Sequence, residues 1–217
     1  MLWVFEGPDG VGKSTLIKAM KESLENKGNV VYTTYAPNTD IIHRYHPKSA
    51  SEELAAFLFD YTYHVNSMLD ELFDDDAIVL CDRWVPYSSS VYQGAKLAIE
   101  NNIPLEEALN TTLSFYANVL SSSVFENIVP TVTVYIKGDM DIIKERITKR
   151  GEIDQRFEND ERLKRVVAMY NMLFEQEMYK LLPQYDKTIM IELPADMPVE
   201  EKVDTIWRSI TDFKLHR

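Results

Sequence analysis

One short stretch, FEGPDGVGKST at residues 5–15, constrains the fold of this chain more than any other part of the sequence. It follows a β-rich run and precedes a helix-forming segment. Four of its residues match the pattern G-x-x-x-x-G-K-[ST]: Gly7, Gly12, Lys13 and Ser14. In such a loop the glycines let the backbone curl so that successive N–H groups point inward, where the following helix start adds positive potential. The stretch therefore predicts a phosphate-binding loop in a strand–loop–helix unit.

Five short β-rich runs alternate with longer stretches that have helical patterns. The runs are LWVFE at 2–6, VVYTT at 30–34, AIVLC at 77–81, TVTVYIK at 131–137 and TIMIEL at 188–193. Each gap can hold a crossover helix, and strands that are apolar along their length are typical of a parallel sheet covered on both faces. The sequence predicts an α/β, three-layer P-loop NTPase fold, in which helices flank a five-stranded parallel sheet.

Two helix starts can be recognised from local signals. Ser49 and Glu52 have capping-box spacing, which predicts a helix from Ser49 to about Phe73. Pro198 comes two residues after Asp196, as a first-turn proline comes after a capping residue, and it predicts a C-terminal amphipathic helix through about Phe213.

Composition narrows the classes of partner. We expect residues 1–217 to form one domain, because 45% hydrophobic content can fill a core and no linker-like stretch interrupts the chain. A formal charge of −12 excludes a general basic footprint for a nucleic-acid polymer, so an anion must be held by a local cluster. The single cysteine, Cys81, has no partner for an internal disulfide, and no run approaches the roughly 18 apolar residues of a membrane span. We expect a cytoplasmic protein without a membrane partner.

Asp82 and Arg83 follow the third predicted strand, at the edge where open α/β sheets bind their ligands. An aspartate there can hold magnesium or its water, and the planar fork of an arginine suits a phosphate group. A salt-bridged pair with no further role is a common alternative. The segment SSSVYQG at 88–94 favours a binding site, because it supplies hydroxyls, an aromatic ring and an amide at a helix start.

Four segments, taken in order, resemble the thymidylate kinase family: FEGPDGVGKST, DRW, SSSVYQG and RGEIDQRFE. The family pattern reads roughly FEGxDGxGKST, DRY, a serine-rich turn, AYQG and a lid ending in DRFE. The resemblance covers residues 2 to about 175. It implies transfer of the γ-phosphate of ATP, with Mg²⁺, to a deoxynucleoside 5′-monophosphate, dTMP or a related pyrimidine nucleotide, and it implies a homodimer.

The resemblance and the loop pattern together predict the nucleotide sites. The predicted ATP site comprises Gly7, Pro8, Asp9, Gly10, Val11, Gly12, Lys13, Ser14, Thr15 and Arg146. Lys13 is expected to reach the β- and γ-phosphates. The predicted metal ligands are Ser14, Asp82 and Asp9.

The predicted acceptor site comprises Asp9, Pro37, Phe57, Asp60, Tyr61, Arg83, Ser88, Ser89, Tyr92 and Gln93. The resemblance implies that Arg83 grips the acceptor phosphate. It implies that Asp9 lies by the acceptor sugar and magnesium, and that Tyr92 lies under the deoxyribose, where it disfavours a 2′-hydroxyl.

The segment FLFDYTYHV resembles the family stretch F-x-x-[DN]-R, which holds the base. Helical spacing alone puts Phe57, Asp60, Tyr61 and His64 on one face of their helix. We predict a pocket wall in which Phe57 stacks on a base, with His64 as a structural residue. Core packing is the alternative for such an aromatic stripe.

Three departures from the family pattern leave the base preference open. Tyr61 occupies the position of the family's base-edge arginine, so a charged donor is replaced by a phenol. Of the family's Arg-Glu-Pro-Gly-Gly loop, only Pro37 clearly corresponds. Trp84 replaces a tyrosine, and the segment from Asp82 to Tyr92 is one residue longer, which suits a larger or modified pyrimidine.

The acceptor is already an anion, so the predicted chemistry needs alignment and charge neutralisation rather than a general base. The variable positions of the phosphate loop hold no cation, so we expect one from a lid at about 150–158 that closes over the phosphates. Arg150 is the first candidate and Arg156 the second, with Arg146 one helical turn before Arg150. Surface pairing with neighbouring acidic residues is the alternative. The predicted catalytic set is Lys13, Asp9, Arg83, Arg150 and Arg156.

Alternatives from other classes stay open to different degrees. A switch GTPase normally needs an Asn-Lys-x-Asp guanine reader after a later strand. The Asn26-Lys27 pair is followed by Gly28 and Asn29, which argues strongly against a GTPase. A deoxynucleoside kinase acting on the unphosphorylated nucleoside would need a carboxylate base near the 5′-hydroxyl. A non-catalytic nucleotide-binding regulator would not need the intact Lys13 and its catalytic neighbours.

Overall fold

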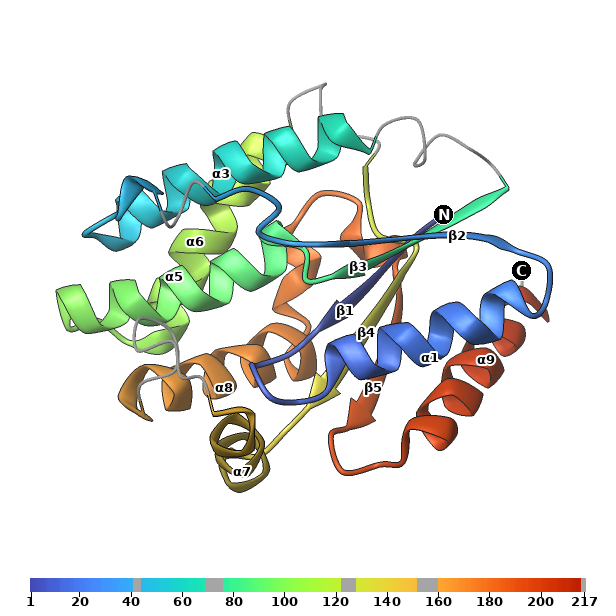
Figure 1. Ribbon diagram of the computed structural model, residues 1–217. Coiled ribbons are helices and arrows are strands. Elements are labelled where there is room, and N and C mark those ends of the chain that lie inside the picture. Colours follow the sequence, from blue (N-terminus) through green and yellow to red (C-terminus); the bar gives the residue numbers. More distant parts are fainter. Residues whose placement is uncertain (41–43, 69–75, 122–127, 152–159, 216–217) are drawn as a thin grey trace.

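The computed structural model describes residues 1–217 except 41–43, 69–75, 122–127, 152–159 and 216–217. Within the described residues, one parallel sheet contains β1 (Leu2–Glu6), β2 (Val30–Tyr35), β3 (Ala77–Asp82), β4 (Val132–Lys137) and β5 (Ile189–Pro194). The strand order is β2-β3-β1-β4-β5 (Figure 1). The predicted five-stranded parallel sheet is confirmed, and each predicted strand lies within one residue of its observed bounds.

The strand register brings the carboxyl ends of the central strands together. Phe5 of β1 pairs with Asp82 of β3 on one side and with Val134 of β4 on the other. The loop that follows β1 therefore starts beside the end of β3, at the edge where open parallel sheets bind ligands. All five residues of β1 are buried, which explains why this strand is apolar almost without alternation.

Helices cover both faces of the sheet, as predicted (Figure 1). On one face α1 (Lys13–Glu25) and α9 (Val199–Leu215) lie side by side. The other side holds α3 (Ala50–Ser67), α5 (Val85–Asn101), α6 (Leu105–Leu120) and α8 (Asp160–Glu175), followed by the short 3-10 helices η1 (Met178–Leu181) and η2 (Tyr185–Lys187). Val4 packs into an apolar cluster with the second group, whereas Phe5 packs into a separate cluster with α1 and α9. Successive β1 residues thus belong to two cores, which gives three layers.

The two predicted helix starts are confirmed within about one residue. The Ser49 hydroxyl accepts a hydrogen bond from the Glu52 N–H at 3.2 Å and caps α3. The Glu52 carboxylate accepts from the Lys48 N–H at 2.8 Å, one residue before the position that a capping box uses. The predicted end near Phe73 is wrong, because α3 ends at Ser67 and Met68 is its C-cap with a non-helical backbone.

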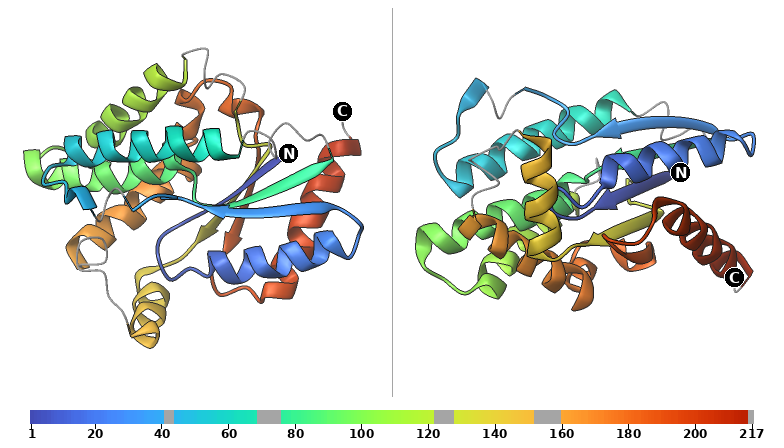
Figure 2. Two further views of the ribbon diagram at one scale, coloured as in Figure 1. Left: turned by 45° about the horizontal axis from the view of Figure 1, so that its top comes forward. Right: turned by 60° about the horizontal axis from the view of Figure 1, so that its bottom comes forward.

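α7 (Met140–Arg150) lies at the carboxyl edge of the sheet in both views of Figure 2. Its Asp139 cap accepts from the N–H groups of Asp141 and Ile142. A Cβ placed on Gly10 would come within 3.1 Å of the Ile143 carbonyl oxygen, so the phosphate loop packs directly against this helix. None of the described helices combines the length and the apolar character that a bilayer span needs.

Candidate functional site

A groove of about 990 Å³ opens at the carboxyl edge of the sheet. The groove is lined by residues 9–15 of the phosphate loop and the start of α1, Ile17, residues 33–36 at the end of β2, Asp82, Arg83, Arg146, residues 195–199 after β5, and Lys202. The groove therefore joins the predicted loop to the end of β3. Polar and charged groups from both meet in one place, as the sequence predicted.

The phosphate loop has the backbone that its glycines were expected to allow. Gly7 and Gly12 have φ angles of 139° and 98°, which side chains rarely adopt. A Cβ on Gly7 would lie 2.5 Å from the carbonyl oxygen of Ile136, closer than Cβ atoms come to other heavy atoms in folded proteins. The curled loop thus depends on glycine at Gly7, both for its backbone angle and for its packing against β4.

Lys13 lies within the curl of this loop. Its Nζ donates hydrogen bonds to the carbonyl oxygens of Gly7 and Pro8, each at 3.0 Å. Burial, together with the positive charge of Arg83, lowers the pKa of Lys13 to about 8, although nearby carboxylates oppose the shift. The ammonium group is therefore poised for an anion that would replace the loop carbonyls as its partner.

Ser14 and Asp82 form the part of the site that fits a divalent cation. The Ser14 hydroxyl donates to Oδ2 of Asp82 at 2.7 Å. Hydroxyl and carboxylate oxygens are ligands that Mg²⁺ accepts, and Mg²⁺ in nucleotide sites usually takes only one or two protein ligands beside phosphate oxygens. Among the described residues no group of three or more His, Cys, Asp or Glu could hold a metal ion. The pair of Ser14 and Asp82 fits an ion that phosphate oxygens also bind.

Arg83 is surrounded by side chains from the phosphate loop, α5 and α8. Its guanidinium donates to Asp9 Oδ1 at 2.6 Å, to the Tyr92 hydroxyl at 3.1 Å and to the Tyr170 hydroxyl at 3.2 Å. It also lies over the Tyr92 ring, 4.9 Å from the centroid. Its side chain is 13% exposed and lines the groove, so it is both fixed and accessible.

Asp9 completes this cluster. Its second oxygen accepts a hydrogen bond from the Tyr92 hydroxyl at 2.7 Å. Burial alone would raise the pKa of Asp9, but the positive charges of Arg83 and Lys13 hold it below its ordinary value. Asp9 is therefore ionised, and both of its oxygens orient cationic or hydroxyl donors.

Glu6, which the sequence analysis did not single out, lies behind Arg83. Its side chain is fully buried at the end of β1. Oε1 accepts a hydrogen bond from the Trp84 N–H at 2.6 Å, and Oε2 accepts from the Tyr170 hydroxyl at 2.9 Å. The only signal in the sequence is a carboxylate that ends an otherwise apolar strand.

The predicted base-pocket residues on α3 lie in or near the core. Tyr61 is fully buried, and its ring meets Trp84 edge-on at 5.1 Å between centroids. Asp60 accepts hydrogen bonds from the N–H groups of Asn38 and Thr39, at 3.0 and 2.6 Å. Asp60 thus holds the loop after β2. These contacts agree with the core-packing alternative, and the contact of these residues with a base stays a prediction.

Three further predicted acceptor residues are also buried, whereas Pro37 is half-buried. Phe57 is 9% exposed. The Ser88 hydroxyl donates to the Trp84 carbonyl at 3.1 Å, and the Ser89 hydroxyl accepts from Tyr116 at 2.6 Å. Both serines therefore brace the first turns of α5.

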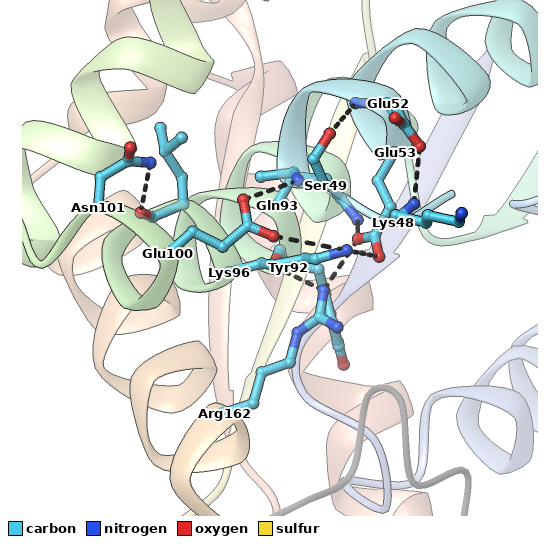
Figure 3. A network of polar contacts seen from close by, with 12 residues as sticks. Lys48, Ser49, Glu52, Glu53, Tyr92, Gln93, Lys96, Glu100, Asn101 and Arg162 are labelled. Atoms are coloured by element: carbon cyan, nitrogen blue, oxygen red, sulfur yellow. Dashed lines mark hydrogen bonds and ion pairs between the residues drawn. The ribbon is translucent and has the colours of Figure 1, made fainter. Parts of the chain in front are cut away.

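Gln93 belongs to a buried network that Figure 3 shows and that sequence reasoning missed. The Glu53 carboxylate accepts hydrogen bonds from Gln93 at 3.0 Å, Lys96 at 2.7 Å and Arg162 at 3.1 Å. Arg162 also donates to the Tyr92 carbonyl at 3.1 Å. The network joins α3, α5 and α8 behind the acceptor residue Tyr92. No local spacing in the sequence links these residues, because their partners are up to 109 positions apart.

Arg146 links the phosphate loop to the segment after β5. Its guanidinium donates to the carbonyl oxygens of Val11 at 2.9 Å and Ala195 at 3.1 Å. Lys202, another residue the sequence analysis missed, donates to the same Ala195 carbonyl at 2.8 Å. Of the other two predicted arginines, Arg156 lies outside the described residues, and Arg150 ends α7 with its side chain outside the description.

Comparisons with known proteins agree with the motifs. The family model described as thymidylate kinase matches residues 5–189. A thymidylate kinase of Malacoplasma penetrans is 28% identical over 96% of this chain and 94% of its own. A thymidylate kinase of Desulfotalea psychrophila is 32% identical over 79% of this chain and 81% of its own.

A solved structure of deoxyadenosine kinase from M. mycoides with bound dATP superposes with a TM-score of 0.68. It covers 97% of this chain and 100% of its own, at 17% identity. At this identity the likeness describes the fold alone.

Proposed function

The chain belongs to the thymidylate kinase family, and we propose that it transfers the γ-phosphate of ATP to a pyrimidine deoxynucleoside 5′-monophosphate, with dTMP as the expected acceptor. The observation that carries this proposal is the Arg83 cluster. A guanidinium fixed by Asp9 and Tyr92 lines the same groove as the phosphate loop. It suits a second phosphate group beside the first.

On the ATP side, Lys13 and the loop N–H groups bind the phosphates, and the helix start of α1 adds positive potential. Ser14 and Asp82 are the side chains that fit Mg²⁺, which when bound neutralises charge on the phosphate oxygens. We propose that the adenosine lies between Arg146 and residues 195–199, because these line the groove beyond the loop.

On the acceptor side, Arg83 binds the 5′-phosphate and aligns it with the ATP phosphates. Because the attacking oxygen already carries charge, the site needs no general base. Asp9 is ionised but bound to Arg83 and Tyr92, so it acts by orienting these groups. This arrangement supports a phosphorylated acceptor over an unphosphorylated nucleoside, whose hydroxyl would need a carboxylate free to accept its proton.

The acceptor base rests on the sequence resemblance. The lid arginines Arg150 and Arg156 are proposed because the variable positions of the phosphate loop hold no cation, and a cytoplasmic location is proposed from the sequence composition. We propose that the base lies toward α3, near Phe57 and Gln93. The Oε1 atom of Gln93 has no hydrogen-bond partner among the described residues, and because it is fully buried a base would reach it only after neighbouring side chains move. An N–H of a pyrimidine is a donor of the kind that it lacks.

The test is an ADP-release assay with a panel of acceptors: dTMP, dUMP, dCMP, dAMP, dGMP, thymidine and deoxyadenosine. The proposal expects turnover with pyrimidine monophosphates, no turnover with either nucleoside, and no turnover in Lys13→Ala. Turnover with a nucleoside and with no monophosphate would replace it by the deoxynucleoside kinase alternative. ATP binding without turnover of any acceptor would favour a regulator.

We also propose a single catalytic domain that forms a homodimer through α3. All described strands share one sheet, which supports one domain. Phe59 and Tyr63 lie one helical turn apart on α3 and are 57% and 54% exposed. Light scattering should give twice the 25.2 kDa chain mass, and Phe59→Ser should give the single mass. A monomeric wild type would reject the dimer.

A further inference from the structure

The backbone of Arg83 is held from β1 on both sides. Arg83 has a φ of 72°, in the left-handed region that non-glycine residues seldom adopt. Its own N–H donates to the Phe5 carbonyl at 3.0 Å. The next N–H, that of Trp84, donates to Oε1 of Glu6 at 2.6 Å. Consecutive residues of β1 thus bind the two N–H groups that flank the unusual backbone angle.

The side chain of Arg83 is linked to the same carboxylate through Tyr170. Arg83 donates to the Tyr170 hydroxyl at 3.2 Å, and Tyr170 donates to Oε2 of Glu6 at 2.9 Å. Because a guanidinium can only donate, Tyr170 must accept from Arg83, and its single proton is left for Glu6. The hydrogen-bond chain therefore runs from Arg83 through Tyr170 and ends on the Glu6 carboxylate.

Glu6 itself is fully buried and lies behind the guanidinium, which leaves the groove-facing side of Arg83 to Asp9, Tyr92 and the groove. Its carboxylate has no role in the proposed chemistry. A fully buried carboxylate is costly unless it is bound and charge-compensated. Here one oxygen accepts from the Trp84 N–H, next to the Arg83 backbone, and the other accepts from the Tyr170 hydroxyl, which contacts the Arg83 side chain.

We propose that Glu6 is a positioning residue that, directly through the Trp84 N–H and indirectly through Tyr170, holds Arg83 in the orientation that binds the acceptor phosphate. The inference rests on the proposed function of Arg83. The proposed role is in binding of the acceptor and not of ATP. Among the described residues, the side-chain hydrogen bonds of Glu6 and Tyr170 go to Trp84, Arg83 and each other and not to the phosphate loop.

The test compares Glu6→Gln and Tyr170→Phe with wild type, using the monophosphate that wild type phosphorylates fastest. In Glu6→Gln the amide oxygen can still accept from the Trp84 N–H, but the NH₂ group cannot accept from Tyr170. In Tyr170→Phe the hydroxyl that joins Arg83 to Glu6 is lost. Both variants should raise the acceptor KM about tenfold and change the ATP KM less than about twofold, as expected when one charged-group hydrogen bond is lost.

Tyr135→Phe is the matched control. Tyr135 stacks on Tyr170 at 6.0 Å between centroids, but its hydroxyl donates to Asn171. This variant should leave both KM values unchanged. If wild type phosphorylates no monophosphate, the proposed function fails. If wild type is active, the positioning role is overturned by an unchanged acceptor KM in either folded variant, or by equal rises in both KM values. Tyr170→Phe decides alone if Glu6→Gln does not fold.

Discussion

The hydroxyl of Ser14 lies 2.7 Å from Oδ2 of Asp82, a residue 68 positions away in the chain. Ser14 belongs to the start of α1 and Asp82 ends β3, so the contact depends on the pairing of β1 with β3. It brings together the two side chains that suit Mg²⁺.

Asp82→Asn should weaken the metal dependence of the reaction. An amide keeps the shape but removes the negative charge, and loss of an oriented metal partner typically costs 10–100-fold in metal affinity. The half-saturating Mg²⁺ concentration should therefore rise by roughly tenfold or more at fixed ATP. Ser14→Thr keeps a hydroxyl and is the control. An unaltered Mg²⁺ curve in Asp82→Asn would remove this residue from the metal site.

The reaction should slow at alkaline pH as Lys13 loses its proton. Burial and the neighbouring Arg83 lower the pKa of Lys13 to about 8, so in the free protein its charge is present below that pH and lost above it. The value of kcat/KM for ATP should fall above about pH 8, because it reports the free protein. At saturating ATP the phosphates favour the charged form, so kcat should stay flat to higher pH.

Lys13→Ala should abolish turnover, and the exposed Lys18→Ala on the same helix should not. A lysine with an ordinary pKa would keep kcat/KM level well past pH 9. A level profile would therefore contradict the burial effect at Lys13.

The phosphate loop and the sheet could be predicted from the sequence because their signals are local. Glycine spacing, apolar runs and the Ser49 cap each act over a few residues. Arg83 was predicted from its place after a strand. By contrast, Tyr170 contacts Glu6 across 164 positions, and Arg162 contacts Glu53 across 109. No periodicity encodes such partners, since tertiary packing alone brings them together.

The aromatic stripe of α3 shows the same limit. Helical spacing correctly put Phe57, Asp60, Tyr61 and His64 on one face, and all four are buried. Spacing does not say whether that face meets a ligand or the core. The fully buried His64, whose Nε2 lies 2.6 Å from the Thr34 hydroxyl, packs inside the fold as the sequence analysis expected.

Tyr61→Arg should destabilise the protein. The new guanidinium would occupy a fully buried position beside Trp84, and an uncompensated buried charge costs about 3–5 kcal/mol. The melting temperature should fall by roughly 10 °C, whereas the exposed Asn66→Arg on the same helix should change it little. The ratio of dTMP to dCMP turnover in the same variant tests the sequence-based role, and an unaltered ratio would reject Tyr61 as a base reader.

Arg83→Lys should separate charge from shape. Lysine keeps one positive charge for Asp9 but cannot contact Asp9, Tyr92 and Tyr170 with a planar fork. The acceptor KM should rise at least tenfold at an unchanged ATP KM, and the exposed Arg208→Lys should have no effect. Full activity in Arg83→Lys would mean that charge alone suffices. In Arg83→Ala turnover should be lost, and retained turnover would reject its assignment to the acceptor phosphate.

Glu6 should make the protein less stable as the pH rises. Burial raises the pKa of Glu6 from an ordinary 4.5 to about 7, although Arg83, the Trp84 N–H, Tyr170 and Lys13 oppose the shift. Between these two values the folded protein binds more protons at this site than the unfolded chain. The free energy of unfolding therefore falls as the pH rises through this window, and its contribution is present only below it.

Glu6→Gln cannot titrate at this position, so its free energy of unfolding should lack this decline. Urea unfolding at pH 5 and pH 8 should show the difference between variant and wild type moving in favour of the variant, by up to about 3 kcal/mol. Other titrating groups are common to both proteins and cancel in that difference. The variant should thus gain relative stability at the same pH where it loses acceptor affinity, as expected when a buried charge is retained to position Arg83. If the difference in free energy of unfolding between variant and wild type does not vary with pH, Glu6 is ionised across the whole range. Its burial would then not lower the stability of the folded protein as the pH rises.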